Sequence, residues 1–164
     1  MIDANILDWL LEGDPSIQLQ VRRDLLGADE GVLAKPGSLI LGSGWGARFL
    51  AARKLDGHWG RGYYQPKWTC THYSLQDLRR LEPPREAPAI RASIAMLLDE
   101  TDGPDGGIYY SPLLVRTGRP SDVCLNGMAV DFASYFRVTA PRLRRLVDLL
   151  LATRMADFGW NCEG

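Results

Sequence analysis

A six-residue turn pattern occurs three times in this chain at nearly regular spacing. The three copies are residues 55–60, 104–109 and 156–161. Trp59, Ile108 and Trp160 hold the same place in the copies, 49 and 52 residues apart, and each copy follows a stretch with helical character. Self-similarity at this spacing is typical of repeat proteins, in which each helical hairpin must stack on its neighbours to bury its apolar face. The pattern therefore predicts an array of helical hairpins.

Seven stretches have the apolar spacing of helices, and none shows the sustained alternation of strands. They are residues 6–11, 16–26, 47–54, 71–81, 87–99, 121–136 and 143–151. The last is the clearest, because five aliphatic residues recur at i, i+3, i+4, i+7 and i+8 with charged residues opposite. The aliphatic residues are Leu143, Leu146, Val147, Leu150 and Leu151, and the charged ones are Arg142, Arg145 and Asp148. We predict an all-α protein.

The turns and the helices before them resemble the repeat of prenyltransferases and squalene cyclases. In that repeat an outer helix ends in a Gly-x-Trp turn and an inner helix follows. Residues 44–50 leading to 56–59 fit this pattern, as do residues 146–150 leading to 159–160. The family's glutamine in the outer helix is absent, since Arg53 and Arg154 occupy about that place. The resemblance implies an α/α toroid, and it bears on fold more than on activity.

The resemblance also implies which helices line the centre of the ring. Those that begin near Ser16, Thr71 and Ser121 are the candidate inner helices, and the others are outer helices. Residues 1–164 would then form a single helical-repeat domain of three hairpins plus one outer helix, about half of the implied ring. A chain of 164 residues with 46% hydrophobic content is long enough to bury one such core.

Composition restricts the partners and the compartment. A net charge of -1, from 19 basic and 20 acidic residues, leaves no electrostatic footprint for nucleic acid or an anionic membrane. No apolar run approaches the ~20 residues of a membrane span, and the first residues lack the basic segment of a secretory signal, so we expect a cytoplasmic protein. Three cysteines make a disulfide framework unexpected, which leaves thiols or metal ligands.

Asp122 and Cys124 begin a candidate inner helix, where N-terminal dipoles would gather at one mouth of the ring. They resemble the aspartate and cysteine zinc ligands of protein prenyltransferase β subunits, in which a histidine from a later inner helix completes the site and zinc activates a thiol. Zinc accepts all three ligand types. Here the third ligand would come from His72, Cys162 or another chain. Alternatively, Asp122 caps the helix and Cys124 is a small buried hydrophobe.

His72 lies one residue into the helix predicted at 71–81, so its imidazole is expected to face the cavity mouth. There it would bind an anionic headgroup such as a diphosphate, or act as a general acid or base. The alternative is a structural histidine that is hydrogen-bonded to a loop carbonyl.

Aromatic residues crowd the segments 63–68 and 109–110 and suggest a cavity for an apolar or isoprenoid ligand. The binding candidates are Tyr64, Trp68, Tyr73 and Asn126. Alternatively, such rings lock adjacent hairpins together, which is the interpretation favoured for Trp45, Trp59 and Trp160.

The leading functional hypothesis is a zinc-assisted or anion-assisted site that acts on or binds an apolar, isoprenoid-like small molecule. The rival is a non-catalytic helical-repeat interaction module. The Asp-x-Asp-Asp and Asp-Asp-x-x-Asp motifs of terpene chemistry do not occur, which disfavours a cyclase. The apolar stripe of the last helix has no later inner helix in the 164 residues to cover it, so we expect a homodimer.

Overall fold

The computed structural model describes residues 3–161, and helices form all the regular secondary structure of this range apart from one isolated bridge between Asp102 and Ile108. The helices are α1 (Ala4–Leu11), α2 (Pro15–Gln20), α3 (Glu30–Leu39), α4 (Gly44–Ala52), α5 (Thr71–Leu81), α6 (Pro88–Glu100), α7 (Pro112–Arg116), α8 (Val123–Tyr135) and α9 (Pro141–Ala152). A π-helical turn, η1 (Val21–Leu25), continues α2 without a break. The all-α prediction is confirmed for this range, and none of its helices is long and apolar enough to cross a membrane.

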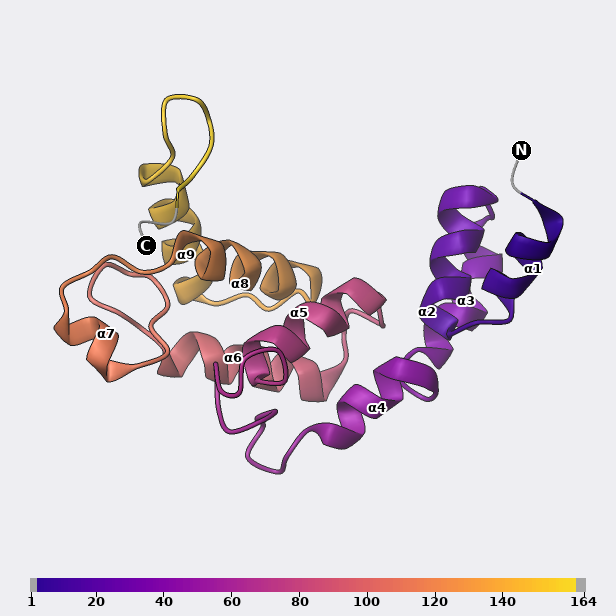
Figure 1. Cartoon of the computed structure of the whole chain (residues 1–164), viewed down its shortest axis with the longest axis horizontal. Coiled ribbons are helices and arrows are strands. Elements are labelled where there is room, and N and C mark those ends of the chain that lie inside the picture. The colour runs from indigo at the N-terminus through magenta and orange to yellow at the C-terminus, as the bar shows by residue number, and fades with distance from the viewer. Residues whose placement is uncertain (1–2, 162–164) are drawn as a thin grey trace.

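The helices form an arc, with α1–α3 at one end, α4, α5 and α6 along the base, and α9 at the other end (Figure 1). Within the arc α5 packs against α8, and α6 packs against α9. In addition, α5 contacts both α4 and α6, and α8 contacts α9. The pairs α5 and α8, and α6 and α9, are far apart in the sequence but lie side by side in the fold.

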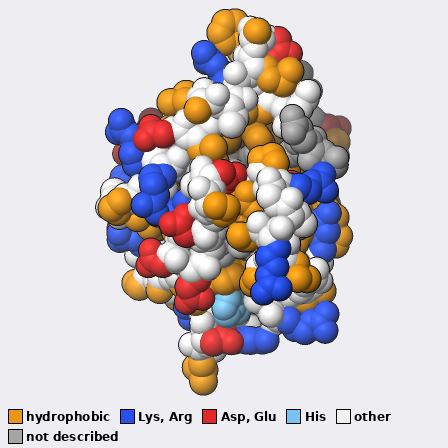
Figure 2. All heavy atoms as spheres, turned by 90° about the vertical axis from the view of Figure 1, so that its left-hand side faces the viewer, with side chains coloured by type: hydrophobic (Ala, Val, Ile, Leu, Met, Phe, Trp, Pro, Cys, Tyr) orange, Lys and Arg blue, Asp and Glu red, His pale blue; other side chains and the backbone are white. Residues whose placement is uncertain are grey.

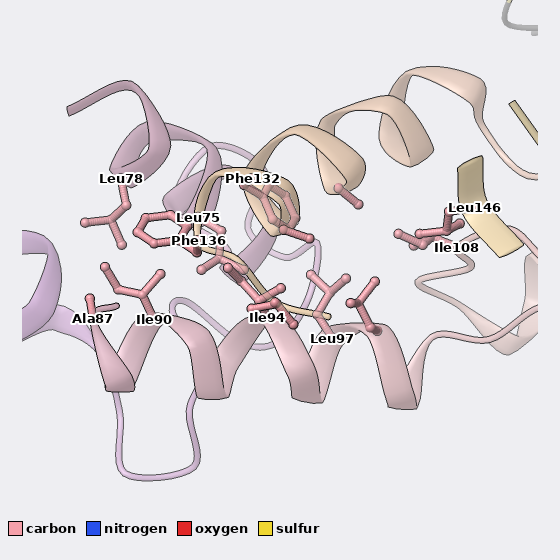
Figure 3. Close-up of a cluster of buried hydrophobic side chains, with 14 of the residues drawn as sticks. Leu75, Leu78, Ala87, Ile90, Ile94, Leu97, Ile108, Phe132, Phe136 and Leu146 are labelled. Atoms are coloured by element: carbon pink, nitrogen blue, oxygen red, sulfur yellow. The ribbon is translucent and has the colours of Figure 1, made fainter. Parts of the chain in front are cut away.

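The hydrophobic core lies between α5, α6 and α8. Figure 3 shows the side chains that point toward one another across it: Leu75 and Leu78 from α5, Ile90, Ile94 and Leu97 from α6, Phe132 from α8, and Phe136 directly after α8. Trp59 and Ile108, from the first two recurring turns, are buried in the same core, and so is Leu146 of α9. Because nonpolar burial is the main favourable term in folding, these contacts fix the two turns relative to the helices.

The three recurring turns close with equivalent backbone hydrogen bonds. The N–H to carbonyl pairs are Lys54 to His58 at 2.9 Å, and Gly103 to Gly107 and Met155 to Gly159, both at 3.0 Å. In each turn an aspartate carboxylate also accepts the backbone N–H two residues later; the three aspartates are Asp56, Asp105 and Asp157. The prediction of three like turns at these positions is confirmed.

The tryptophans of the first and third turns are held by the same type of bond. Trp59 Nε1 donates to the carbonyl of Phe49, and Trp160 Nε1 donates to the carbonyl of Leu150, both at 2.7 Å. Their surroundings differ, since Trp59 is 2% exposed and Trp160 is 43% exposed. Trp59 therefore joins its turn to α4 inside the core, while Trp160 closes its turn at the surface.

Two helices, α3 and α7, are not among the seven that the sequence predicts. In α3, Gly31, Pro36 and Gly37 argue against a helix, because proline lacks an N–H donor and glycine has low helix propensity. Pro36 is nevertheless buried, and α3 packs against α2, so tertiary contacts outweigh these local preferences. The short helix α7 starts at Pro112 behind the N-cap Ser111. α3 lies between the predicted inner helix at 16–26 and the predicted outer helix at 47–54. It therefore interrupts the expected alternation of inner and outer helices.

Arg142 does not lie on the polar face that the sequence predicts for α9. Its guanidinium is buried, donates to the carbonyls of Gly106 and Gly107, the latter at 2.7 Å, and pairs with Asp102 at 2.8 Å. Burial lowers the pKa of Arg142 from its usual value. The turn carbonyls and the carboxylate satisfy the buried charge, which periodicity alone does not reveal. Within the predicted apolar stripe, Leu146 is buried and Leu151 is exposed.

Candidate functional site: an aromatic pocket beside the start of α8

Thr71 fixes the start of α5 to the first turn. Its hydroxyl accepts the Trp59 backbone N–H at 3.1 Å and donates to the Gly62 carbonyl at 2.9 Å. The backbone N–H groups of Thr71 and His72 donate to the carbonyls of Gly62 and Tyr63 at 3.1 and 3.0 Å. These bonds satisfy N–H groups that the first turn of a helix leaves unpaired, and they hold the preceding loop against α5.

Asn126 fixes the start of α8 to the second turn. Its Oδ1 accepts the Ile108 backbone N–H, and its Nδ2 donates to Ser121 Oγ, both at 2.8 Å. The Ser121 N–H donates in turn to Asp105 at 2.7 Å, and this bond contributes to the lowered pKa of that carboxyl against the effect of burial. Asn126, a predicted ligand-binding residue, is itself buried, and its amide is used to join the turn to the helix.

Beside the start of α8 lies a pocket of about 230 Å³, which we name the tyrosine pocket. Its wall combines the loop before α5, the second turn, α7 and the first turn of α8. The wall residues used below are Tyr64, Ile108, Tyr110, Leu114, Arg119, Asp122 and Leu125. A mostly apolar wall with a few polar groups is the usual character of a small-molecule site.

Stacked tyrosine rings form one side of this pocket. Tyr64 and Tyr110 stack with centroids 5.2 Å apart and planes 12° apart, and Tyr63 stacks on Tyr110 at 6.0 Å. The hydroxyl groups of Tyr64 and Tyr73 lie 3.2 Å apart, and Tyr73 is buried. Of the predicted binding residues, Tyr64 therefore lines the pocket, and Tyr73 does not line it but contacts Tyr64.

Trp68 lies elsewhere. Its ring contacts Tyr73 at 4.8 Å, but most of it is exposed, and it lines a separate groove of about 260 Å³ together with Trp45 and Trp59. The aromatic set that the sequence groups into one cavity is thus divided between a pocket and an outer groove.

His72 is fully buried against Tyr110 and does not line the tyrosine pocket. Its Nε2 lies 3.3 Å from the Met128 sulfur, and its Nδ1 is hydrogen-bonded to the Tyr110 hydroxyl. Because a thioether sulfur can only accept, we assign the ring proton to Nε2, so that Nδ1 accepts the Tyr110 proton. Burial lowers the pKa of His72 to about 4, which keeps the ring neutral near pH 7. The ring therefore lies behind the wall, not at the cavity mouth as the sequence predicts.

The phenols of the pocket are neutral as well. Burial raises the pKa of Tyr64 and of Tyr110 above the usual value, and the contact with Tyr73 raises that of Tyr64 further. Neutral aromatic faces accommodate hydrocarbon and also attract cations. The tyrosine rings are thus suited to an apolar ligand, and among the lining residues of the pocket the positive charge comes from Arg119.

Asp122 and Cys124 lie at the start of α8, and both are exposed, so Cys124 is not the buried hydrophobe of the alternative interpretation. Asp122 occupies the N-cap position, but its side chain makes no capping bond. Within residues 3–161 no group of three or more His, Cys, Asp or Glu side chains is arranged to hold a metal ion. His72 is occupied by its own partners, and Cys162 lies outside the described residues. A catalytic zinc site takes three protein ligands, and the described residues around Asp122 and Cys124 do not bring three candidates together.

Helix α7, which is not predicted from the sequence, contributes Leu114 to the pocket. Leu114 reaches the pocket because α7 begins directly after the second turn. The signal was present, since Ser111 followed by Pro112 is a helix start, and the Ser111 hydroxyl accepts the Leu113 N–H at 3.2 Å.

The fold and the pocket define an all-α protein with an aromatic cavity beside a helix start. Comparisons with protein-family models, with curated proteins and with solved structures found no match to this chain. The likeness to the prenyltransferase and squalene-cyclase repeat therefore stays a prediction from the sequence pattern.

Proposed function

We propose that this chain is about half of an α/α toroid and that its tyrosine pocket binds an apolar, isoprenoid-like small molecule. The toroid part is supported by the three turns with equivalent hydrogen bonds, and by the packing of α5 on α8 and of α6 on α9. In such an arrangement α5 and α8 are inner helices and α6 and α9 are outer helices.

The binding part depends chiefly on one observation, a pocket lined by the stacked pair of Tyr64 and Tyr110 together with Ile108, Leu114 and Leu125. A hydrocarbon that enters this pocket loses contact with water, which is favourable in proportion to the nonpolar area buried. At about 230 Å³ the pocket is smaller than the cavities of roughly 300–1,000 Å³ that hold drug-sized ligands. A short isoprenoid is therefore the better fit.

The ligand headgroup is expected to be uncharged. His72 is neutral, and the pocket wall carries one guanidinium, Arg119, and one carboxylate, Asp122, so it has no net positive charge. An anion would gain Arg119 but meet the Asp122 carboxylate, whereas a hydroxyl finds both a donor and an acceptor. Geraniol, a short isoprenoid alcohol, should thus bind at least as well as geranyl diphosphate, and a strong preference for the diphosphate would instead support the anion-assisted site.

Two neighbouring residues of α7 provide a matched test. Leu114 lines the pocket, whereas Leu113 is exposed and does not. In Leu114→Trp the larger ring should fill the pocket and weaken geraniol binding by about tenfold or more in titration calorimetry. Leu113→Trp should leave binding unchanged. Equal affinities of the two variants would place the ligand elsewhere and overturn the proposal.

Zinc has no role in this proposal, because within the described residues no three candidate ligands are brought together. The zinc hypothesis keeps its own test, which is elemental analysis of protein purified without a metal-affinity tag. Stoichiometric zinc that is lost in Cys124→Ser but kept in Cys70→Ser would support a site at the start of α8.

The rival function, a non-catalytic interaction module, is favoured by large apolar side chains exposed at both ends of the arc, among them Trp9 and Leu151. The two proposed functions predict different effects of Leu114→Trp: this substitution should weaken binding of a ligand in the tyrosine pocket but not binding of a protein partner at the ends of the arc.

A further inference from the structure

We propose that two copies of this chain associate head to tail, with α1 of each copy seated in a groove along α9 of the other. The proposal concerns the two ends of the arc and is independent of the tyrosine pocket.

Helix α1 has no buried residue, although it is rich in apolar side chains. Ile6 and Trp9 lie one turn apart on its exposed side, and Trp9 is 70% exposed. An eight-residue helix is marginal on its own in water, and most helix stability in proteins comes from packing of the apolar face. The exposed face of α1 therefore has the character of a docking surface.

At the other end of the arc, an open groove of about 400 Å³ runs along α9. Its apolar lining is Ala140, Leu143, Val147 and Leu151, with Arg144 and Asp148 at its edges. Leu151 is 61% exposed. Figure 2 looks onto the end of the molecule that carries α7 and α9, and shows hydrophobic side chains interspersed with basic and acidic ones. This is the surface into which an amphipathic helix fits.

Charge decides which helix fits. Residues 3–30 carry seven acidic and two basic residues, whereas residues 137–154 carry one acidic residue and five arginines, of which Arg142 is buried and paired with Asp102. On α1, Asp8 and Glu12 flank the exposed Trp9. On α9 the side chain of Arg144 is highly exposed and makes a long contact of 3.4 Å with Asp148, a weak surface pair. A second α9 would bring arginines together, whereas α1 brings carboxylates to them.

The shape of the chain makes this contact intermolecular. α1 and α9 lie at opposite ends of the arc, so a chain cannot place its own α1 on its own α9 (Figure 1). Two arcs related by a twofold axis satisfy both ends at once and close the assembly, as cyclic dimers do. We therefore infer that α1 of a second copy of the chain fills the groove along α9.

Substitutions at exposed positions test the contact without disturbing the fold. Trp9→Glu and Leu151→Glu should each weaken the dimer by at least about tenfold in its dissociation constant, because each change affects both contacts of the closed pair. Leu55→Glu is the matched control, since Leu55 is fully exposed on the first turn, and it should leave the dimer unchanged. Analytical ultracentrifugation measures the masses.

Mixing the two variants distinguishes head-to-tail pairing from pairing of like ends. Trp9→Glu keeps an intact α9 and Leu151→Glu keeps an intact α1, so a mixed dimer retains one unaltered contact. An equimolar mixture should therefore form this dimer at a protein concentration at which neither variant dimerises alone. Raising the salt concentration should weaken the wild-type dimer. A wild-type mass of 18.3 kDa at micromolar concentration would overturn the proposal. A Trp9→Glu variant that dimerises as tightly as the wild type would also overturn it, as would a mixture that stays monomeric or a dissociation constant that does not change with salt.

Discussion

Trp59 and Trp160 make the same hydrogen bond in two turns of the same design, so their replacement by alanine separates the effect of burial from that of the bond. Trp59 is 2% exposed and belongs to the central core. Truncation of a buried aromatic residue costs about 3–5 kcal/mol, so Trp59→Ala should lower the free energy of unfolding by that amount. Trp160 is 43% exposed, so its truncation removes a net hydrogen-bond contribution of about 0.5–1.5 kcal/mol and a smaller amount of packing.

Urea unfolding followed by far-ultraviolet circular dichroism measures both losses, and the unchanged slope with denaturant serves as the check for two-state behaviour. The expected order is a large loss for Trp59→Ala and a loss of about 1–2 kcal/mol for Trp160→Ala. Similar losses in the two variants would refute the argument that burial sets the cost. A loss below about 1 kcal/mol in Trp59→Ala would refute the placement of this ring in the core.

Two further outcomes follow from the packing around the site. Gly107→Ala should destabilise the fold by about 1–3 kcal/mol, because the added Cβ would lie 1.7 Å from Ser121 Oγ. Gly127→Ala is the control: its Cβ would meet nothing within 4 Å, so it should be neutral or stabilise α8 by up to about 1 kcal/mol. Equal losses of unfolding free energy in the two variants, measured in urea, would contradict this argument. His72 should make the free energy of unfolding depend on pH, because its pKa is 6.5 in the unfolded chain and about 4 in the folded one. Above pH 6.5 the ring is neutral in both states, and between pH 6.5 and 4 the unfolded chain binds the proton more readily, so the folded state loses about 3 kcal/mol of stability. His72→Gln should flatten this slope, and an unchanged slope would exclude His72 as its source.

The recurring turns show what local sequence can predict. Each turn is closed by bonds between residues that are two to ten positions apart, such as the Asp56 carboxylate with the His58 N–H, or Trp59 Nε1 with the Phe49 carbonyl. Gly57 and Gly106 take positive φ angles of 88° and 85° at the same place in their turns, which glycine adopts without steric cost. Such short-range requirements are visible in the sequence, and the turns and the bounds of α5 were predicted correctly for this reason.

The candidate site was predicted less well, because its parts are far apart in the chain. Tyr64 and Tyr110 stack across 46 positions, and the sequence indicates that both are aromatic but not that they meet. Asn126 has the polarity of a ligand-binding residue, yet its amide is consumed by Ile108 and Ser121. Polarity alone cannot distinguish a group that binds a ligand from one that satisfies a buried backbone N–H.

The sequence by itself determined the helical class and the three turns, because helix periodicity and turn chemistry depend on neighbours within a few residues. Only the tertiary structure decided that Pro36 lies inside a helix, that Arg142 is buried, and that His72 is neutral behind the pocket wall. In each case the local preference is worth a few kcal/mol at most, and contacts made by distant segments either outweigh it or satisfy the buried group.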